Sequence, residues 1–206
     1  MKINFLGDSI TQGIGASDLA HAYPSRVREK LGCTVLNYGI SGTRIAREKI
    51  KSESVFLDWD FQQRALMMDK DADLVFVFGG TNDFGHGTSL FGEPDSEDIY
   101  TYIGGLRSLI NYLISVYGRE KLCFMLPLRR LEEEENRNGK TLKDYVDAMI
   151  EILNKYGVSY IDLYYNGLPK PKSKEPDEYF DDGLHPNDNG AEWLADKVLE
   201  YIKARG

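Results

Sequence analysis

The stretch Lys2-Ile3-Asn4-Phe5-Leu6-Gly7-Asp8-Ser9 decides how the rest of the sequence is interpreted. Ile3, Phe5 and Leu6 predict a short apolar strand, and Gly7 ends it. A strand that runs into a tight glycine turn places the next side chain at the carboxyl edge of a sheet, where open α/β sheets bind their ligands. Ser9 is therefore expected at that edge, as a hydroxyl that becomes a nucleophile if a base reaches it. Taken alone, Gly-Asp-Ser fits better with an ordinary turn in which Ser9 caps a helix, so the remaining chain has to decide.

Strand and helix patterns alternate along the whole chain. Further strands are predicted over residues 34–38, 73–78, 121–126 and 158–162, and helices over residues 23–31, 60–68, 96–117, from 141 onward, and 189–204. Thr141 and Asp144 resemble a capping box, and the polar residues 43–56 are ambiguous, with helix expected for parts of them. Because no composition break, repeat or linker interrupts the alternation, we expect a single domain over residues 1–206. Its fold class is α/β, with a five-stranded, mostly parallel, flavodoxin-like sheet that carries helices on both faces.

Composition narrows the class of protein. The chain has 206 residues, enough for one α/β domain with a substantial core, and a formal net charge of −8. That charge argues against binding to nucleic acid or to an anionic membrane, because both need clustered Lys and Arg. No basic-then-apolar leader and no apolar run of membrane-spanning length occurs, so a cytoplasmic protein is the default expectation. Cys33 and Cys123 do not make a disulfide framework, and Cys123, inside an apolar strand, is expected to be a buried free thiol.

Four polar, glycine-containing turns follow the predicted strands. They are residues 7–9 (GDS), 39–42 (GISG), 79–83 (GGTND) and 181–186 (DDGLHP). The carboxyl ends of parallel strands open on one edge of the sheet, so these turns are expected to meet there.

The side chains in these turns supply the parts that acyl transfer needs. Ser9 is the candidate nucleophile and His185 the candidate base. Asp182, three residues before His185, can hold the imidazole Nδ1–H within one turn, and it is preferred to Asp181 for this spacing. Gly42 can bring a bare backbone N–H close to a developing oxyanion. Asn82 can aim its amide at the same oxygen, and the Ser9 backbone N–H would be the third donor. Gly39 competes with Gly42 for this role but is interpreted as the glycine that ends its strand.

With these residues in place, the chain resembles the SGNH, or GDSL, hydrolases. The four blocks that carry the resemblance are residues 5–11 (FLGDSIT), 37–42 (NYGISG), 79–83 (GGTND) and 182–186 (DGLHP). All four occur in order and together span almost the whole chain, with no departure in the core motifs. The resemblance implies a three-layer α/β/α fold and an esterase or acylhydrolase that uses no metal and no cofactor. It implies a triad of Ser9, Asp182 and His185, with Gly42 and Asn82 in the oxyanion hole.

The family's substrates differ widely, so the resemblance leaves the substrate open. We favour a short acyl group, such as an O-acetyl group on a carbohydrate, carried by a small-molecule or carbohydrate ester. A lysophospholipase or thioesterase acting on longer chains is the alternative, and it is less favoured because no apolar stripe that would build a long groove is evident. Acyl transfer to an alcohol in place of water, and the oligomeric state, are also open.

Three other classes fit less well. A two-metal phosphoesterase needs several His and Asp ligands, including an Asp-x-His near the start, whereas this chain has three histidines and no Asp-x-His. A nucleotide-binding domain needs Gly-x-Gly-x-x-Gly or a P-loop lysine, and neither follows the first strand. A non-catalytic carbohydrate-binding domain on this fold would have no reason to keep a complete triad.

The remaining polar and aromatic residues near the motifs receive structural interpretations. Asp8 and Asp83 are expected to stabilise turns, and the glutamates of residues 132–135 to form a solvated face. Residues 127–141 would also suit a flap over the site. His86 is interpreted as an exposed loop histidine, with pocket lining as the alternative. Four aromatic residues near the site are expected to serve packing rather than to form a substrate wall: Trp59, Phe84, Tyr164 and Tyr165.

Overall fold

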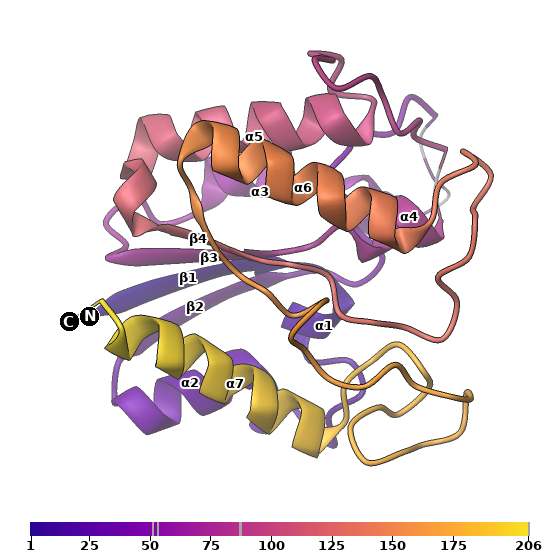
Figure 1. Cartoon of the computed structure of the whole chain (residues 1–206). Helices are drawn as coiled ribbons and strands as arrows, with labels where there is room; N and C mark the ends of the chain where they lie inside the picture. The colour runs from indigo at the N-terminus through magenta and orange to yellow at the C-terminus, as the bar shows by residue number, and fades with distance from the viewer. Residues whose placement is uncertain (51, 53, 87, 206) are drawn as a thin grey trace.

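The computed structural model describes residues 1–50, 52, 54–86 and 88–205, and five parallel strands form its centre (Figure 1). The strands are β1 (Lys2–Gly7), β2 (Thr34–Gly39), β3 (Leu74–Phe78), β4 (Leu122–Met125) and β5 (Ser159–Ile161). Their order in the sheet is β2-β1-β3-β4-β5, and every neighbouring pair is parallel. This confirms the α/β class and the flavodoxin-like order that the sequence predicts.

Helices cover both faces of the sheet. They are α1 (Ser9–Gln12), α2 (Tyr23–Leu31), α3 (Phe61–Met67), α4 (Thr81–Gly85), α5 (Tyr102–Tyr117), α6 (Leu142–Tyr156) and α7 (Asp188–Lys203), with 3-10 turns at Val55–Asp58 and Arg119–Lys121. Figure 1 shows α2 and α7 together on one face and α3, α5 and α6 on the other. Three layers result, as the family resemblance implies.

The central strands alternate their side chains between two cores. Leu6 and Val77 pack with the α3, α5 and α6 side, whereas Phe5 and Phe76 pack with the α2 and α7 side. Phe5 and Phe76 stack with their ring centroids 5.2 Å apart. Because both faces of β1 and β3 are covered, both strands are largely apolar along their length, a pattern typical of buried parallel strands.

Some predicted boundaries shift, for local reasons. The long helix begins at Tyr102 rather than at residue 96, because Thr101 caps it: the Thr101 hydroxyl accepts the N–H of Gly104 at 3.1 Å. Within the described part of residues 43–56 no α-helix forms, and residues 51 and 53 lie outside the description. The predicted capping box is present, with Thr141 and Asp144 bonded reciprocally.

Cys123 is the buried free thiol that the sequence predicts. It is 1% exposed in β4, and burial raises the pKa of its thiol to about 12. In the described residues, no helix is long and apolar enough to cross a membrane.

One buried cation ties the carboxyl ends of two strands together. Arg64 lies in α3 on the inward face that Phe61 and Ala65 share, and it is 3% exposed. Its guanidinium donates to the carbonyl oxygens of Gly7, at 2.6 Å, and of Tyr38. It also donates to the carbonyl of Trp59 at 2.9 Å and to the hydroxyl of Thr43 at 2.6 Å. Gly7 ends β1 directly before the Asp8-Ser9 turn, so Arg64 fixes where that turn departs from the sheet.

We expect Arg64→Met to destabilise the fold strongly. Methionine fills much of the space but leaves several buried carbonyl oxygens without this donor, at a cost of about 3 kcal/mol in the free energy of unfolding. For a chain of this size that corresponds to a fall in Tm of roughly 6–12 °C. The control is Arg28→Met on the exposed face of α2, where a fall of no more than about 2 °C is expected. Equal melting temperatures for the two variants would contradict the structural role of Arg64.

Candidate active site

Ser9, His185 and Asp182 form a continuous hydrogen-bonded line. His185 Nε2 lies 3.0 Å from the Ser9 hydroxyl, and His185 Nδ1 lies 2.7 Å from a carboxylate oxygen of Asp182. A carboxylate only accepts, so Nδ1 carries the proton and the Nε2 lone pair faces Ser9. Ser9 and His185 are 176 residues apart in sequence, and the topology alone brings them together. The arrangement can therefore take the proton of the Ser9 hydroxyl.

Asp182 also shapes the turn that presents His185. Its second oxygen accepts the backbone N–H groups of Leu184, at 3.0 Å, and His185, at 2.8 Å. Gly183, which directly follows Asp182, has φ +80°, a backbone conformation that favours glycine. Partial burial opposes ionisation of Asp182, but the His185 backbone N–H and imidazole outweigh it and lower the carboxyl pKa. Asp181, the alternative partner, instead donates its backbone N–H to the carbonyl of His185 at 2.8 Å.

The serine turn is built by Gly7 and Asp8. A Cβ on Gly7 would lie 1.9 Å from the Thr11 hydroxyl oxygen, so only glycine fits where α1 folds back onto β1. Asp8 caps α1 by accepting the Ile10 N–H at 3.0 Å, as predicted for a turn-stabilising carboxylate. Burial raises the Asp8 pKa to about 6. Ser9 is consequently the first residue of a short helix, and the residue is 4% exposed.

Gly42 has the geometry that a bare backbone donor requires. Its φ is +76°, and an added Cβ would lie 2.4 Å from Leu57 Cδ2. Gly39, the competing glycine, ends β2 and packs against α1, where its Cβ would meet the Gln12 backbone nitrogen at 2.3 Å. Among the described residues, the backbone N–H groups of Ser9 and Gly42 have no acceptor. Both are thus free to donate to a substrate oxygen.

Asn82 is held by its neighbours on both sides of the amide. It lies in α4, is 5% exposed, and donates from Nδ2 to the carbonyl of Thr43 at 3.0 Å. Its Oδ1 lies 3.0 Å from His86 Nε2. The next residue, Asp83, accepts the backbone N–H groups of Ile45 at 3.0 Å and Ala46 at 2.8 Å, which fastens α4 to the segment after Gly42. Burial raises the Asp83 pKa to about 6.

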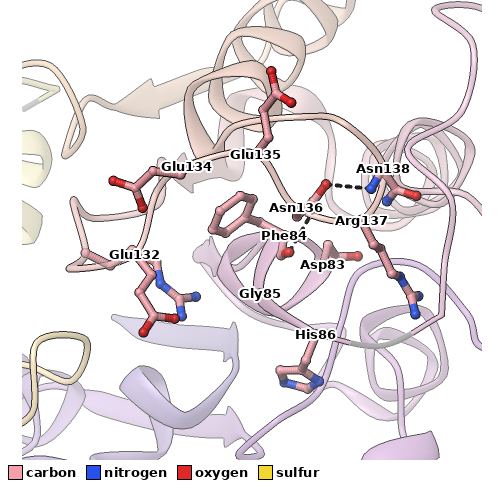
Figure 2. Close-up of a pocket in the computed structure, with 11 residues that line it drawn as sticks. Asp83, Phe84, Gly85, His86, Glu132, Glu134, Glu135, Asn136, Arg137 and Asn138 are labelled. Atoms are coloured by element: carbon pink, nitrogen blue, oxygen red, sulfur yellow. Dashed lines mark hydrogen bonds between the residues drawn. The ribbon is translucent and has the colours of Figure 1, made fainter.

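Two cavities include residues of the candidate site in their walls. The larger has a volume of about 650 Å³ and is lined mostly by polar side chains. Its lining residues are Asp83, Phe84, Gly85, His86, Arg130, Glu132, Glu134, Glu135, Asn136, Arg137 and Asn138. Figure 2 shows Glu132 and Glu134 on one side of it and Arg137 and Asn138 on the other, with His86 at the lower edge. A second cavity of about 250 Å³ adjoins Asp182 and shares Arg130 and Glu132 with the first. Within the described ranges, no group of three or more His, Cys, Asp or Glu side chains is placed to hold a metal ion.

Residues 127–141, predicted as a possible flap, wall the larger cavity. The Leu131 N–H donates to the Gly183 carbonyl at 2.8 Å, and Asn136 Nδ2 donates to the Phe84 carbonyl at 2.9 Å. The glutamate run in this segment is not uniformly solvated. Glu133 is 8% exposed and accepts from Arg129, so the prediction of a solvated face fails there. Glu133 can be buried because the guanidinium of Arg129, four residues earlier, pairs with its carboxylate.

Two residues that shape the site, Arg64 and His86, were not predicted to do so from the sequence. The role of Arg64 could have been inferred from its position in the sequence. It shares the apolar helix face formed by Phe61, Ala65 and Met68, and a buried cation needs hydrogen-bond partners. His86 was interpreted as an exposed loop histidine. It is exposed, as that interpretation expects, and it also lines the cavity and contacts Asn82, as the alternative of pocket lining expects. The four aromatic residues that the sequence places near the site differ in exposure. Phe84 and Tyr164 are buried, whereas Trp59 and Tyr165 are 37% and 48% exposed.

Comparison with known proteins finds related esterases and a matching family. An acetylxylan esterase of Xylanibacter ruminicola is 26% identical over 98% of this chain, although the chain spans only 43% of that relative. A solved structure that is 33% identical covers 98% of this chain and 96% of its own, with a TM-score of 0.80. The solved acetyl xylan esterase AlAXEase is 22% identical, covers 98% of this chain and 100% of its own, and has a TM-score of 0.68. The model of the GDSL-like Lipase/Acylhydrolase family matches residues 5–193, and the chain belongs to that family.

Proposed function

We propose that this protein is a serine esterase that removes short acyl groups, such as O-acetyl groups on a carbohydrate, through an acyl-Ser9 intermediate. The observation that carries the proposal is the line from Ser9 through His185 to Asp182, with separations of 3.0 and 2.7 Å. Its tautomer is the one that a general base needs, because the Nε2 lone pair faces the hydroxyl.

The proposed mechanism has two steps. In the first, His185 takes the Ser9 proton while the Ser9 oxygen attacks the ester carbonyl. The carbon–oxygen bond to the alcohol then breaks, and the alcohol leaves with the proton from His185. In the second, water gives a proton to His185 and attacks the acyl-Ser9 carbonyl. The acid is released, and the proton returns to Ser9. Asp182 keeps the imidazole oriented and stabilises the imidazolium in both steps.

The oxyanion that forms in each step needs donors that are already in place. The backbone N–H groups of Ser9 and Gly42 and the amide of Asn82 are our candidates. Gly7 and Gly42 permit tight backbone paths at which an added Cβ would clash with Thr11 and Leu57, respectively. Because these donors are fixed by the fold, little reorganisation is needed as charge develops.

Two features support a short acyl group on a polar alcohol. The larger cavity, which Asp83 and His86 help to line, has mostly charged and amide side chains, with Phe84 as the one large apolar side chain among the described residues that line it. Such a wall suits hydroxyl groups better than an acyl chain. The 26% identical relative is named as an acetylxylan esterase, which agrees with this choice of substrate.

A second candidate, hydrolysis of longer acyl esters, also has an observation in its favour. Val55 and Phe56 are 66% and 69% exposed, and they adjoin Leu57, which packs over Gly42. Exposed apolar side chains beside the site could receive a longer chain. Substrate length distinguishes the two candidates.

The test is hydrolysis of p-nitrophenyl esters from acetate to palmitate. We expect a maximum at acetate or butyrate, no effect of EDTA, and a loss of roughly 10⁴-fold or more in kcat for Ser9→Ala. The control is Ser115→Ala on the exposed face of α5, expected to retain full activity. Turnover that survives Ser9→Ala, or that EDTA abolishes, would refute the mechanism. A maximum at long chains would favour the second candidate.

Asp182→Asn tests the tautomer argument. An amide oxygen at this position can still accept both backbone N–H groups, but the NH2 group would face His185 Nδ1 and force the imidazole proton onto Nε2. The base would then point a proton at Ser9, and we expect kcat to fall by roughly 10³–10⁴-fold with little change in Tm. The matched control is Asp181→Asn, one residue away and exposed, with kcat within about threefold of wild type. Equal activity of the two variants would remove Asp182 from the mechanism.

A further inference from the structure

His86 bridges a buried arginine and the amide of Asn82. Arg44 Nη1 lies 3.0 Å from His86 Nδ1, and His86 Nε2 lies 3.0 Å from Asn82 Oδ1. A guanidinium has only donors, so His86 Nδ1 must be the acceptor in the first contact. The ring proton of neutral His86 is therefore on Nε2, which donates to Asn82.

This donor decides which end of the Asn82 amide faces which way. With Oδ1 bound to His86, the amino group faces the Thr43 carbonyl, to which it donates at 3.0 Å. If the amide were flipped, Asn82 Oδ1 would face the Thr43 carbonyl oxygen, and both atoms are acceptors. The amino group would face the Nε2–H of His86, and both groups are donors. Neither contact could then form a hydrogen bond, which leaves these polar groups unpaired. The observed orientation keeps one N–H of Asn82 without a protein acceptor among the described residues. That N–H is the one available to an oxyanion.

Arg44 also forms an ion pair with a buried carboxylate. Arg44 Nε lies 2.9 Å from a carboxylate oxygen of Glu48, with the two side chains only 5% and 6% exposed. Glu48 in turn accepts the Thr88 N–H at 2.8 Å and the Ser89 hydroxyl at 3.1 Å. The His86 ring also lies beside the second candidate donor, because its Cε1 is 4.0 Å from where a Cβ on Gly42 would stand.

The charged groups around His86 favour the neutral ring. Partial burial lowers the His86 pKa, Arg44 and Arg130 lower it further, and Glu48 opposes them. At neutral pH the ring thus keeps the lone pair that Arg44 requires.

We propose that His86 is a positioning residue that locks the Asn82 amide as a donor in the oxyanion hole. The inference rests on the proposed esterase function and extends it to a residue outside the four motifs. His86 does not touch the reacting atoms, and its effect passes through Asn82.

The test compares His86→Gln with His86→Met, two variants of similar length and shape. Glutamine can place an N–H near the Nε2 position, whereas methionine cannot donate. We expect kcat/KM for p-nitrophenyl acetate within about threefold of wild type for His86→Gln and a loss of roughly 10–100-fold for His86→Met. The control is His21→Met, at a histidine that contacts Ser17 and Asp18 instead, with activity unchanged. Equal losses in the Gln and Met variants would overturn the proposal.

A double-mutant cycle shows whether the effect passes through Asn82. In an Asn82→Ala background, His86→Met should cost no more than about twofold, because the amide it positions is gone. The same large loss in both backgrounds would assign His86 a general structural role and overturn the inference.

A measurement independent of activity separates this inference from the proposed function. The ¹⁵N spectrum of histidine-labelled wild-type protein should show His86 with a bare Nδ1 and a protonated Nε2 at pH 7.5. Protonation at Nδ1 would overturn the inference even if the enzyme is an esterase. Absence of ester hydrolysis by wild type would refute the proposed function while the tautomer still tests the bridge.

Discussion

The guanidinium of Arg64 holds the carboxyl ends of β1 and β2, and the site depends on that contact. Strands that end in turns leave carbonyl oxygens without ladder partners, and buried ones must find donors. Arg64 reaches the carbonyls of Gly7 and Tyr38 together and so fixes the distance between the two strand ends. Those ends lead directly to Ser9 and towards Gly42. Burial lowers the Arg64 pKa to about 10, partly offset by Asp8 and Asp60, so the side chain remains a cation at neutral pH.

The buried carboxylates of Asp8 and Asp83 fix the loops by accepting backbone N–H groups, as Arg64 fixes the strand ends by donating to backbone carbonyls. Asp8 holds the N–H of Ile10, and Asp83 holds those of Ile45 and Ala46. Burial raises both pKa values to about 6, above the ordinary value of 3.8. The folded state therefore binds more protons than the unfolded state between about pH 4 and pH 6, and these two groups lower stability as the pH rises through that window. The fold bears this cost because an acceptor of two N–H groups at one point, as at Asp83, cannot be replaced by a neutral amide without leaving one N–H unpaired.

The order of the elements was predictable, and the residues of the candidate site could be proposed, because their signals are local. A glycine turn after an apolar run marks a strand end, and parallel strand ends share an edge, so Ser9, Gly42, Asn82 and His185 could be grouped from their positions in the sequence. The preference for Asp182 over Asp181 followed from reach within one turn, and the contact between Asp182 and His185 agrees with it. The start of α5 was misplaced because the apolar spacing continues through Ile99, and only the cap at Thr101 shows where the chain turns. The partners of Arg64 and His86 could not be identified, because they lie 5 to 57 and 4 to 42 residues away and the sequence does not say which residues they are.

The two histidines of the site are held in opposite tautomers, and their neighbours explain why. His185 contacts a carboxylate, which only accepts, so Nδ1 is protonated and Nε2 is left as a base facing Ser9. His86 contacts a guanidinium, which only donates, so Nδ1 is bare and Nε2 donates to Asn82. Under the proposed mechanism the first ring must change its protonation in every cycle, whereas the second must never change it. A carboxylate stabilises the imidazolium that the first ring becomes, and a buried arginine opposes a second charge on the other ring. The difference between a moving proton and a fixed one is thus set by the charge of one neighbour in each case.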